Sequence, residues 1–240
     1  MPIQTVEPQR LYRQIAEQLR QLMASGEFTV GSRLPAERDL AAQLGVSRPS
    51  VREALIALEV EGMIEVRTGS GIYVQSTTLA KSPTRDTTSD APAEWGPLEV
   101  MSARILVEAE VAALAARNAQ KKDLQNIRAG LQKMKLEAAR DEVPRWGDEA
   151  FHEGIAQACG NSVLLDTVQR FWQARNGPLF ERLGDYFEHP ASWQAAIAEH
   201  QMVLDAIEAR DSSGARKAMQ KHLKQAYKRY SASWRRAPAR

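Results

Sequence analysis

Residues 33–74 constrain the fold of this chain more than any other stretch, because signals for two helices and a hairpin follow one another without a gap. Pro35 comes just before the acidic residues Glu37 and Asp39, a pattern typical of a helix start. Gly45 comes where a helix end favours a left-handed residue. The sequence therefore predicts a short helix between Pro35 and Gly45.

A second helix is predicted directly after this one. Ser47 is a suitable N-cap, and Pro49 falls in the first helical turn. The helix is expected to end at Gly62, and its apolar residues recur at helical spacing, at Val51, Leu55 and Leu58. These residues predict a core-facing stripe.

Beyond Gly62 two short apolar runs, residues 63–66 and 72–74, flank the turn Thr68-Gly69-Ser70-Gly71, which is typical of a β-hairpin. Upstream, an amphipathic helix is predicted to cover the core through Leu11, Ile15, Leu19 and Leu22. Helix, turn, helix and hairpin in this order predict a winged helix-turn-helix, which places a helix in the major groove of DNA.

Three arginines give this fold a chemical role. Arg48 and Arg52 lie four residues apart, so they share a helix face, and their spacing from the apolar stripe is expected to turn them away from the core. Arg38 is expected to reach the same side. An arginine fork binds guanine or clamps phosphate. The alternative is a solvated face on which Arg38 and Arg52 pair with the neighbouring Asp39 and Glu53.

The run LPAERDLAAQLGVSRPSVREALIALEVEGMIEVRTGSGIYV closely resembles the DNA-binding domain of the GntR family of bacterial transcription regulators. The resemblance implies that the three arginines contact DNA and that the wing tip enters the minor groove. The DNA-binding residues expected on this basis are Arg38, Ser47, Arg48, Ser50, Arg52, Thr68, Gly69, Ser70 and Gly71.

Composition sets limits on the rest of the chain. The first 75 residues hold eight arginines, no lysine and nine acidic residues, which argues against strong non-specific DNA binding through bulk charge. No apolar run reaches eighteen residues, and the N-terminus lacks a signal peptide, so we expect a cytoplasmic bacterial protein without membrane contact. Cys159 is the single cysteine and is expected to be a buried structural thiol.

The chain divides by composition into two domains. Residues 76–95 are rich in Ser, Thr, Asp and Pro, which predicts a linker between a DNA-binding domain at 8–75 and a second domain at 96–235. In the second domain apolar residues such as Leu106, Ala109 and Ala113 recur at helical spacing. Six or seven helices in an all-α bundle are predicted, at about 97–118, 121–140, 145–159, 161–175, 178–187, 191–209 and 211–234.

Four residues of this bundle are candidate metal ligands. Asp148 and His152 lie four residues apart on one helix and share a face, while His200 and His222 each lie one turn from apolar residues. Buried histidines need partners, and an Asp/His₃ set suits a divalent transition metal, zinc first, with nickel or manganese as alternatives. The competing interpretation is a pair on the helix surface. His189 is expected in an exposed loop.

A second resemblance covers residues 98–232, to the FCD ligand-binding domain of the FadR subgroup. It rests on Arg104-x-x-x-Glu108 with the following Ala112-Ala113-Leu114-Ala115-Ala116, on Asp148-x-x-x-His152, and on Asn161, His200 and His222. The resemblance implies that the Asp and three His hold the metal and that a small carboxylate binds beside it, paired with Arg104. The alternative for Arg104 is a surface ion pair with Glu108.

The segments GPLEVMSARILVEAE and FWQARNGPLF look like those of the hexuronate-utilisation repressors in this subgroup. Trp172, Arg175 and Asn176 offer an indole, a guanidinium and an amide, which suit a polyhydroxylated acid. A core tryptophan with an interhelical cap is the alternative for these three residues. A sugar acid is therefore the expected effector, ahead of lactate or another short hydroxy acid.

These features predict a homodimeric transcription regulator, a repressor of carboxylic-acid or sugar-acid catabolism genes, that reads a pseudo-palindromic double-stranded operator. Dimerisation follows from the resemblance and from the need for two half-sites. Two alternatives stay open: the metal is itself the signal or is purely structural, or the helical domain is a metalloenzyme fused to a DNA-binding head.

Overall fold

The computed structural model describes residues 10–78 and 95–231. The chain forms two compact units that divide between Leu98 and Glu99. Most of the predicted linker, residues 79–94, lies outside the described residues, as do both ends of the chain. Among the described helices, none combines the length and the apolar character that a membrane span requires.

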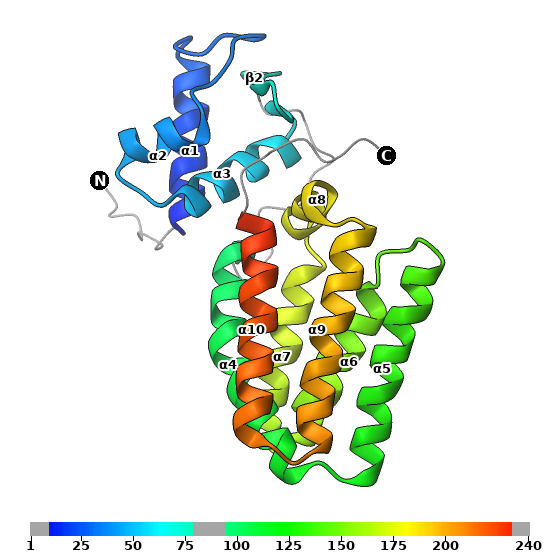
Figure 1. Ribbon diagram of the computed structural model, residues 1–240. Coiled ribbons are helices and arrows are strands. Elements are labelled where there is room, and N and C mark those ends of the chain that lie inside the picture. The colour runs from blue at the N-terminus through cyan, green and yellow to red at the C-terminus, as the bar shows by residue number, and fades with distance from the viewer. Residues whose placement is uncertain (1–9, 79–94, 232–240) are drawn as a thin grey trace, which may run out of the picture. The chain divides into compact units, whose positions relative to one another are not determined.

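The first unit has the predicted order of elements (Figure 1). They are α1 (Leu11–Ala24), α2 (Glu37–Leu44), α3 (Arg48–Val60), β1 (Ile64–Arg67) and β2 (Gly71–Val74). Helices α1 and α2 both pack against α3, and β1 pairs antiparallel with β2, with Ile64 opposite Val74 and Arg67 opposite Gly71. The predicted winged helix-turn-helix is confirmed.

Local signals explain these element bounds. Gly45 ends α2 with a φ of 67°, in the left-handed region where a side chain costs energy. Ser47 caps α3 by accepting a hydrogen bond from the Ser50 backbone N–H at 3.3 Å. Val51, Leu55 and Leu58 of the predicted stripe are fully buried. Helix start, helix end and core face are thus set by neighbouring residues.

The second unit is an all-helical bundle, which confirms the predicted class. Its described helices are α4 (Pro97–Asn118), α5 (Lys121–Ala139), α6 (Arg145–Ala158), α7 (Ser162–Arg175), α8 (Pro178–Phe187), α9 (Pro190–Glu208) and α10 (Ser212–Ser231). The predicted ranges agree with these to within one residue, except at the end of α10, where the predicted last residues lie outside the described part. Cys159, after α6, is buried as predicted.

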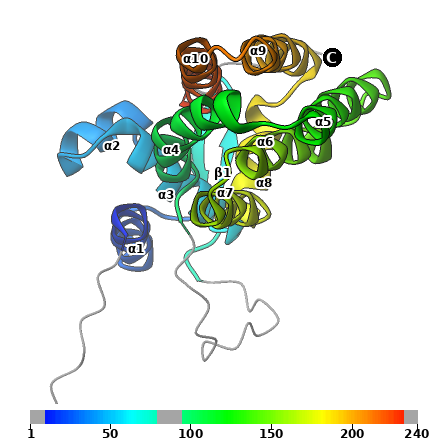
Figure 2. The same ribbon diagram turned by 90° about the horizontal axis from the view of Figure 1, so that it is seen from below.

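The long helices run side by side, and the short α8 lies at one end of the bundle (Figures 1 and 2). Helix α5 packs against α6 and α9, and α9 packs against α10. Two glycines permit the close approach of α5 and α6, because a Cβ on Gly130 would lie 2.6 Å from the Phe151 backbone N, and one on Gly147 would collide with Met134. This contact fixes the position of α6.

One prediction about the core of the bundle is wrong. Leu106 was expected on the apolar stripe of the first bundle helix, together with Ala109 and Ala113. Both alanines are buried, but 70% of Leu106 is exposed. A helix advances by about 100° per residue, so Leu106 lies about 20° from Ala113, at the edge of the buried face of α4, where its longer side chain reaches the surface.

Candidate functional site

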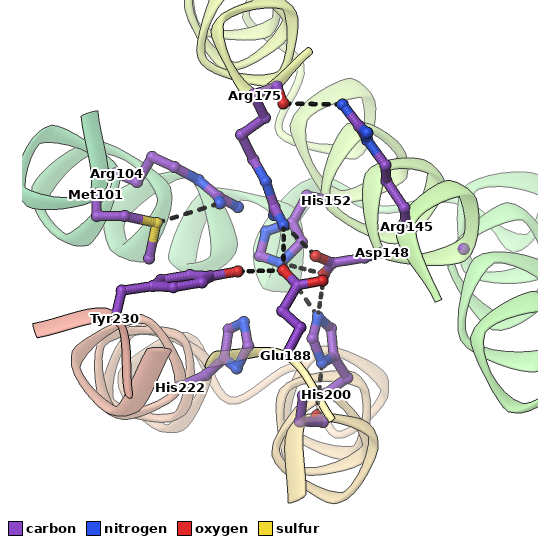
Figure 3. Close-up of polar contacts among 12 residues, drawn as sticks. Met101, Arg104, Arg145, Asp148, His152, Arg175, Glu188, His200, His222 and Tyr230 are labelled. Atoms are coloured by element: carbon purple, nitrogen blue, oxygen red, sulfur yellow. Dashed lines mark hydrogen bonds and ion pairs between the residues drawn. The ribbon is translucent and has the colours of Figure 1, made fainter. Parts of the chain in front are cut away.

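Four side chains from three helices meet inside the bundle of the second unit. Helix α6 supplies Asp148 and His152, α9 supplies His200 and α10 supplies His222, and their ligand atoms all lie within 4.8 Å of one another (Figure 3). His200 Nε2 lies 2.9 Å from Asp148 Oδ1 and 3.1 Å from His152 Nε2. The four residues singled out in the sequence are therefore brought together.

The other ring nitrogen of each histidine is occupied by an acceptor. These Nδ1 contacts join His152 to Glu108 Oε2 at 2.5 Å, His200 to the Ala196 carbonyl at 2.6 Å and His222 to Glu199 Oε2 at 2.8 Å. An acceptor at Nδ1 favours the proton on that nitrogen and leaves the Nε2 lone pair available. All three Nε2 atoms are thus prepared to act as ligands at one centre.

This arrangement fits a divalent metal ion. With Nδ1 protonated on each ring, the Nε2 lone pairs of His152 and His200 face each other at 3.1 Å. Such a contact is stable only with a cation or a shared proton at the centre. Three imidazoles and one carboxylate form a ligand set typical of zinc and its neighbours. The three histidines are at most 5% exposed, so the polar partners of their rings lie inside the bundle.

The electrostatics favour the ligating form of two of these residues. In the metal-free state a proton shared at the Nε2 atoms lets His152 and His200 donate to Asp148, and these hydrogen bonds with the charge of Arg175 outweigh the effect of burial, so the pKa of Asp148 lies well below the usual value. Burial, with the nearby His200, lowers the pKa of His222 to about 3. At neutral pH the carboxylate is therefore charged and His222 is neutral, as metal binding requires.

Arg104 and Glu108 form the layer behind His152. The alternative interpretation of the sequence, an ion pair between these two residues, is present, with Arg104 Nε 2.5 Å from Glu108 Oε1. Both side chains are only 2% exposed, so the pair is buried and does not lie at the surface as that alternative expected. Burial opposes the charge on Glu108, but Arg104 and His152 outweigh it and lower its pKa to about 2. Arg104 thus keeps charged the carboxylate that orients His152.

A cavity of about 70 Å³ opens beside the four-residue cluster, enough for roughly five waters or a few ligand atoms without movement of side chains. Four arginines and two carboxylates line it, and its polar lining residues are Arg104, Arg145, Asp148, Arg175, Glu188, Ser192, Trp193, His200, His222, Arg229 and Tyr230. Arg104 and Arg229 also pair with Glu108 and Glu199 behind the lining, so these guanidinium charges are largely balanced, and a bound metal ion would supply the positive charge that suits an acidic ligand.

The predicted effector residues take different places around this cavity. Arg104 and Arg175 line it, and their guanidinium groups lie 4.6 and 4.4 Å from the ring centroid of the buried Trp172. Arg175 also donates to Asp148 Oδ2 at 2.9 Å. Asn176 is not part of the lining: it is the C-cap residue of α7 and accepts a hydrogen bond from Arg145 at 2.6 Å.

Sequence reasoning missed several groups at this site, among them Glu199 and Trp193. Glu199, on the neighbouring helix α9, supports His222 of α10 and also pairs with Arg229 at 3.0 Å. Trp193 lines the cavity, and its indole Nε1 is buried with no hydrogen-bond partner among the described residues. The spacing of residues along the chain did not predict either role, since each role depends on a contact between different helices.

In the first unit the arginines of α3 share one carboxylate of α2. Arg48 Nε donates to Glu37 Oε1 at 2.9 Å, and Arg52 donates to Glu37 Oε2 through Nε at 2.9 Å and Nη2 at 2.6 Å. The expectation that both arginines turn away from the core is wrong for Arg52, which is 1% exposed. The ion pair with Glu37 holds the Arg52 side chain in the buried position against α2. The Arg48 side chain contacts the same carboxylate but is 49% exposed.

The other predicted DNA-binding residues are accessible. Arg38 is 82% exposed and pairs with Asp39 at 3.1 Å, as the alternative interpretation proposed. The hydroxyls of Ser47 and Ser50 lie 2.8 Å apart at the start of α3. The wing tip, which consists of Thr68, Gly69, Ser70 and Gly71, joins β1 to β2.

Glu199 gives a test of the centre that does not alter a ligand. We expect Glu199→Gln to weaken metal binding by about 10- to 100-fold, because the amide supports His222 without the negative charge. Competition with a chromophoric chelator measures the affinity. The matched control is Glu110→Gln, which breaks an exposed pair with Arg216 at 2.6 Å on the bundle surface. Equal affinities in both variants would contradict this role.

Comparison with known proteins adds two family matches. Residues 11–74 match the model of the gntR family of bacterial regulatory proteins, and residues 99–225 match the model of the FCD domain. The two matches correspond to the two compact units.

Curated relatives match nearly the whole chain. The Uxu operon transcriptional regulator of Escherichia coli is 35% identical over 90% of this chain and 84% of its own length. The Exu regulon transcriptional regulator of the same organism is 36% identical over 92% and 84%. An Escherichia coli protein named as a regulatory protein of the L-lactate dehydrogenase operon is 35% identical over 91% and 85%.

Among solved structures, Lar, which controls the expression of the Listeria monocytogenes agr system, has a TM-score of 0.50 at 17% identity. The match covers 94% of this chain and 98% of that one. At this identity the likeness concerns the fold alone.

Proposed function

We propose, from the premise that this chain belongs to the GntR family of bacterial regulatory proteins and carries an FCD domain, that it represses genes of sugar-acid catabolism under the control of a hexuronate or a related acid. Family membership makes the chain a DNA-binding transcription regulator and not an enzyme. The effector, the metal and the dimeric state are our proposals.

The first unit would bind the operator through α3 and the wing. The exposed Arg48 and Arg38 are available for base or phosphate contacts, together with the serines at the start of α3 and the wing tip. A homodimer would present two such units to the half-sites of a pseudo-palindrome. In this proposal the buried Arg52 orients Arg48 and α2 through Glu37 and contributes less directly to DNA contact.

The second unit would hold a divalent metal ion, zinc first, through Asp148, His152, His200 and His222. When bound, the ion would supply a positive charge and open coordination positions that a carboxylate or hydroxyl can occupy. The surrounding residues hold the three imidazoles by their Nδ1 atoms and keep the Asp148 carboxylate ionised, which suits metal binding.

The observation that carries the effector proposal is the charge of the cavity beside this centre. Four arginine side chains line the cavity, and a divalent metal ion would add positive charge to these paired guanidinium groups, which favours an acidic ligand. The unpaired Nε1 of Trp193 and the hydroxyl of Tyr230 are suited to the hydroxyl groups of a sugar acid. The names of the Uxu and Exu relatives support a hexuronate or a related sugar acid.

A short hydroxy acid is the second candidate. The relative named for the L-lactate dehydrogenase operon is 35% identical, nearly the same as the two sugar-acid regulators. The free volume of about 70 Å³ also suits a small acid without any rearrangement. Both candidates bind through the same carboxylate chemistry, so a direct comparison of ligands decides between them.

We expect metal-loaded protein to be stabilised by about 2.7 kcal/mol at a ligand concentration one hundred times the Kd, measured by thermal shift with hexuronates, aldonates and lactate.

Trp193→Phe should weaken the binding of a sugar acid by about tenfold, because it removes one buried hydrogen-bond donor and keeps the aromatic packing. A gel shift on an operator duplex selected by the wild-type protein then measures whether the same acid changes DNA affinity.

The matched control is Trp146→Phe, since Trp146 lies on the same bundle but is 61% exposed. It should leave the ligand affinity unchanged. Stabilisation by lactate alone would replace the sugar acid by the second candidate. The absence of a shift with every acid, together with operator binding that follows the metal concentration, would make the metal itself the signal.

A further inference from the structure

The first unit contains a groove that is lined by predicted DNA-binding residues and also by Arg33, which was not predicted to bind DNA. It has a volume of about 260 Å³ and lies between the start of α2, the start of α3 and the hairpin. Four arginines line it, from the segment before α2, from α2, from α3 and from β1: Arg33, Arg38, Arg48 and Arg67. Arg33 had no role in the sequence interpretation.

Arg33 differs from the other three in its charge balance. Arg38, Arg48 and Arg67 each lie next to a carboxylate, at 3.1 Å from Asp39, 2.9 Å from Glu37 and 2.8 Å from Glu65. Within residues 10–78 and 95–231, Arg33 has no carboxylate or hydrogen-bond acceptor for its guanidinium, and it is exposed. It therefore brings an uncompensated positive charge to the groove.

The backbone holds Arg33 in place against the wing. Arg33 forms an antiparallel bridge with Tyr73, Leu34 N–H donates to the Ile72 carbonyl at 2.8 Å, and Val74 N–H donates to the Ser32 carbonyl at 3.0 Å. The segment thus behaves as a short third strand beside β2. Its side-chain direction is set by this pairing.

Gly71 makes room for the Arg33 side chain. A Cβ at Gly71 would collide with Arg33 Nε and would lie 3.0 Å from Cζ, so the guanidinium end rests on the glycine backbone. Gly71 also has a φ of +139°, which favours glycine. The wing glycine therefore has a second use besides the turn: it seats an arginine from another segment.

We propose that Arg33 binds a backbone phosphate of the operator in this groove. The proposal rests on the DNA-binding mode proposed above. If α3 enters the major groove and the wing enters the adjacent minor groove, the phosphates that separate the two grooves pass between them, where Arg33 lies. A guanidinium is suited to phosphate, and phosphate contacts fix the register of a protein on the duplex. In a near-neutral domain one such cation matters.

The test is Arg33→Ala, with affinity measured by fluorescence anisotropy from 50 to 200 mM salt. The probes are an operator duplex selected from random sequence by the wild-type protein and a scrambled duplex. We expect a loss of roughly tenfold at low salt on both duplexes, and a slope of log K against log salt that is smaller by about 0.9. Arg33→Lys should keep most of the slope.

Arg13→Ala is the matched control, because it removes one exposed arginine from α1 outside the groove. It should leave the slope unchanged. An unchanged slope for Arg33→Ala, or a loss confined to the selected duplex, would overturn the phosphate assignment while leaving operator binding intact. Wild-type protein that selects no duplex would instead contradict the DNA-binding proposal.

Gly71→Ala tests the contact between Gly71 and the Arg33 side chain. We expect it to weaken DNA binding in the wild-type background and to weaken it less in the Arg33→Ala background, because the displaced side chain is then already gone. Any strain in the wing is common to both backgrounds and cancels in the double-mutant cycle. Additive losses would show that Gly71 acts on the wing alone and would remove this part of the proposal.

Discussion

Replacement of His152 by alanine is expected to remove stable metal binding from the second unit. The change deletes one of four ligands and also takes away the Nδ1 group that Glu108 holds at 2.5 Å. Changes to such supporting contacts alone cost about 10- to 100-fold in affinity, so loss of the ligand should cost more than about 100-fold. The metal content after dialysis and a chelator competition measure the loss.

The same variant should lose the stability that metal binding supplies. At a metal concentration one thousand times the Kd, the wild-type unit gains about 4 kcal/mol, whereas the variant gains little at that concentration. Thermal melts with metal and with a chelator should therefore differ strongly for the wild type and only slightly for His152→Ala. Melts of the wild type that do not respond to the chelator would argue against a bound metal.

His189→Ala is the matched control, because His189 is the remaining one of the chain's four histidines and lies outside the cluster. It is the N-cap residue of α9, where its ring accepts a hydrogen bond from the Ser192 backbone N–H. Its loss should cost about 1 kcal/mol in stability through the helix cap, with the metal retained. Metal loss in this control, or retention in His152→Ala, would refute the assigned ligand set.

Replacement of Arg52 by alanine is expected to destabilise the first unit by about 3–5 kcal/mol. Arg52 is 1% exposed, and its two hydrogen bonds hold the Glu37 carboxylate, which is itself largely buried. Removal of one member of a buried pair leaves the other charge with less compensation. Arg48 remains on Glu37 Oε1 but is half exposed, so it compensates only in part. Small domains have few kcal/mol to lose.

Calorimetry of the full-length protein should show the transition of the first unit at a lower temperature, with the metal-dependent transition of the second unit unchanged. Arg38→Ala is the control, because Arg38 is 82% exposed and its loss should change stability by no more than about 0.5 kcal/mol. Arg48→Ala should weaken operator recognition without this loss. A variant at Arg52 that melts like the wild type but no longer binds DNA would restore Arg52 as a direct contact.

The elements of the fold were predictable because their signals are local. Gly45, Ser47 and Gly62 end or start helices through their own backbone conformation or a cap to a neighbour, and the observed φ of Gly62 is +73°. In the bundle the predicted helix bounds agree almost to the residue for the same reason. Such signals act over four or five residues, which is the range that periodicity and caps cover.

The candidate metal centre could be predicted in composition but not in detail. Asp148 and His152 share a helix face by spacing, yet nothing in the spacing of His200 and His222 requires them to meet the first pair. The resemblance to a known family supplied that step. The supporting Glu199 lies next to His200 in sequence but serves His222, a pairing that sequence adjacency would not predict.

The sequence by itself determined which segments become helices and strands, because local propensity, caps and periodicity depend on neighbouring residues. Only the tertiary structure decided which charged side chains are buried and which oppositely charged groups they contact. Arg52 and Arg104 look like surface residues in the sequence, and both are buried because a carboxylate, Glu37 or Glu108, compensates the cost of removing the guanidinium from water. Arg33 likewise acquires its position from pairing with a strand forty residues away.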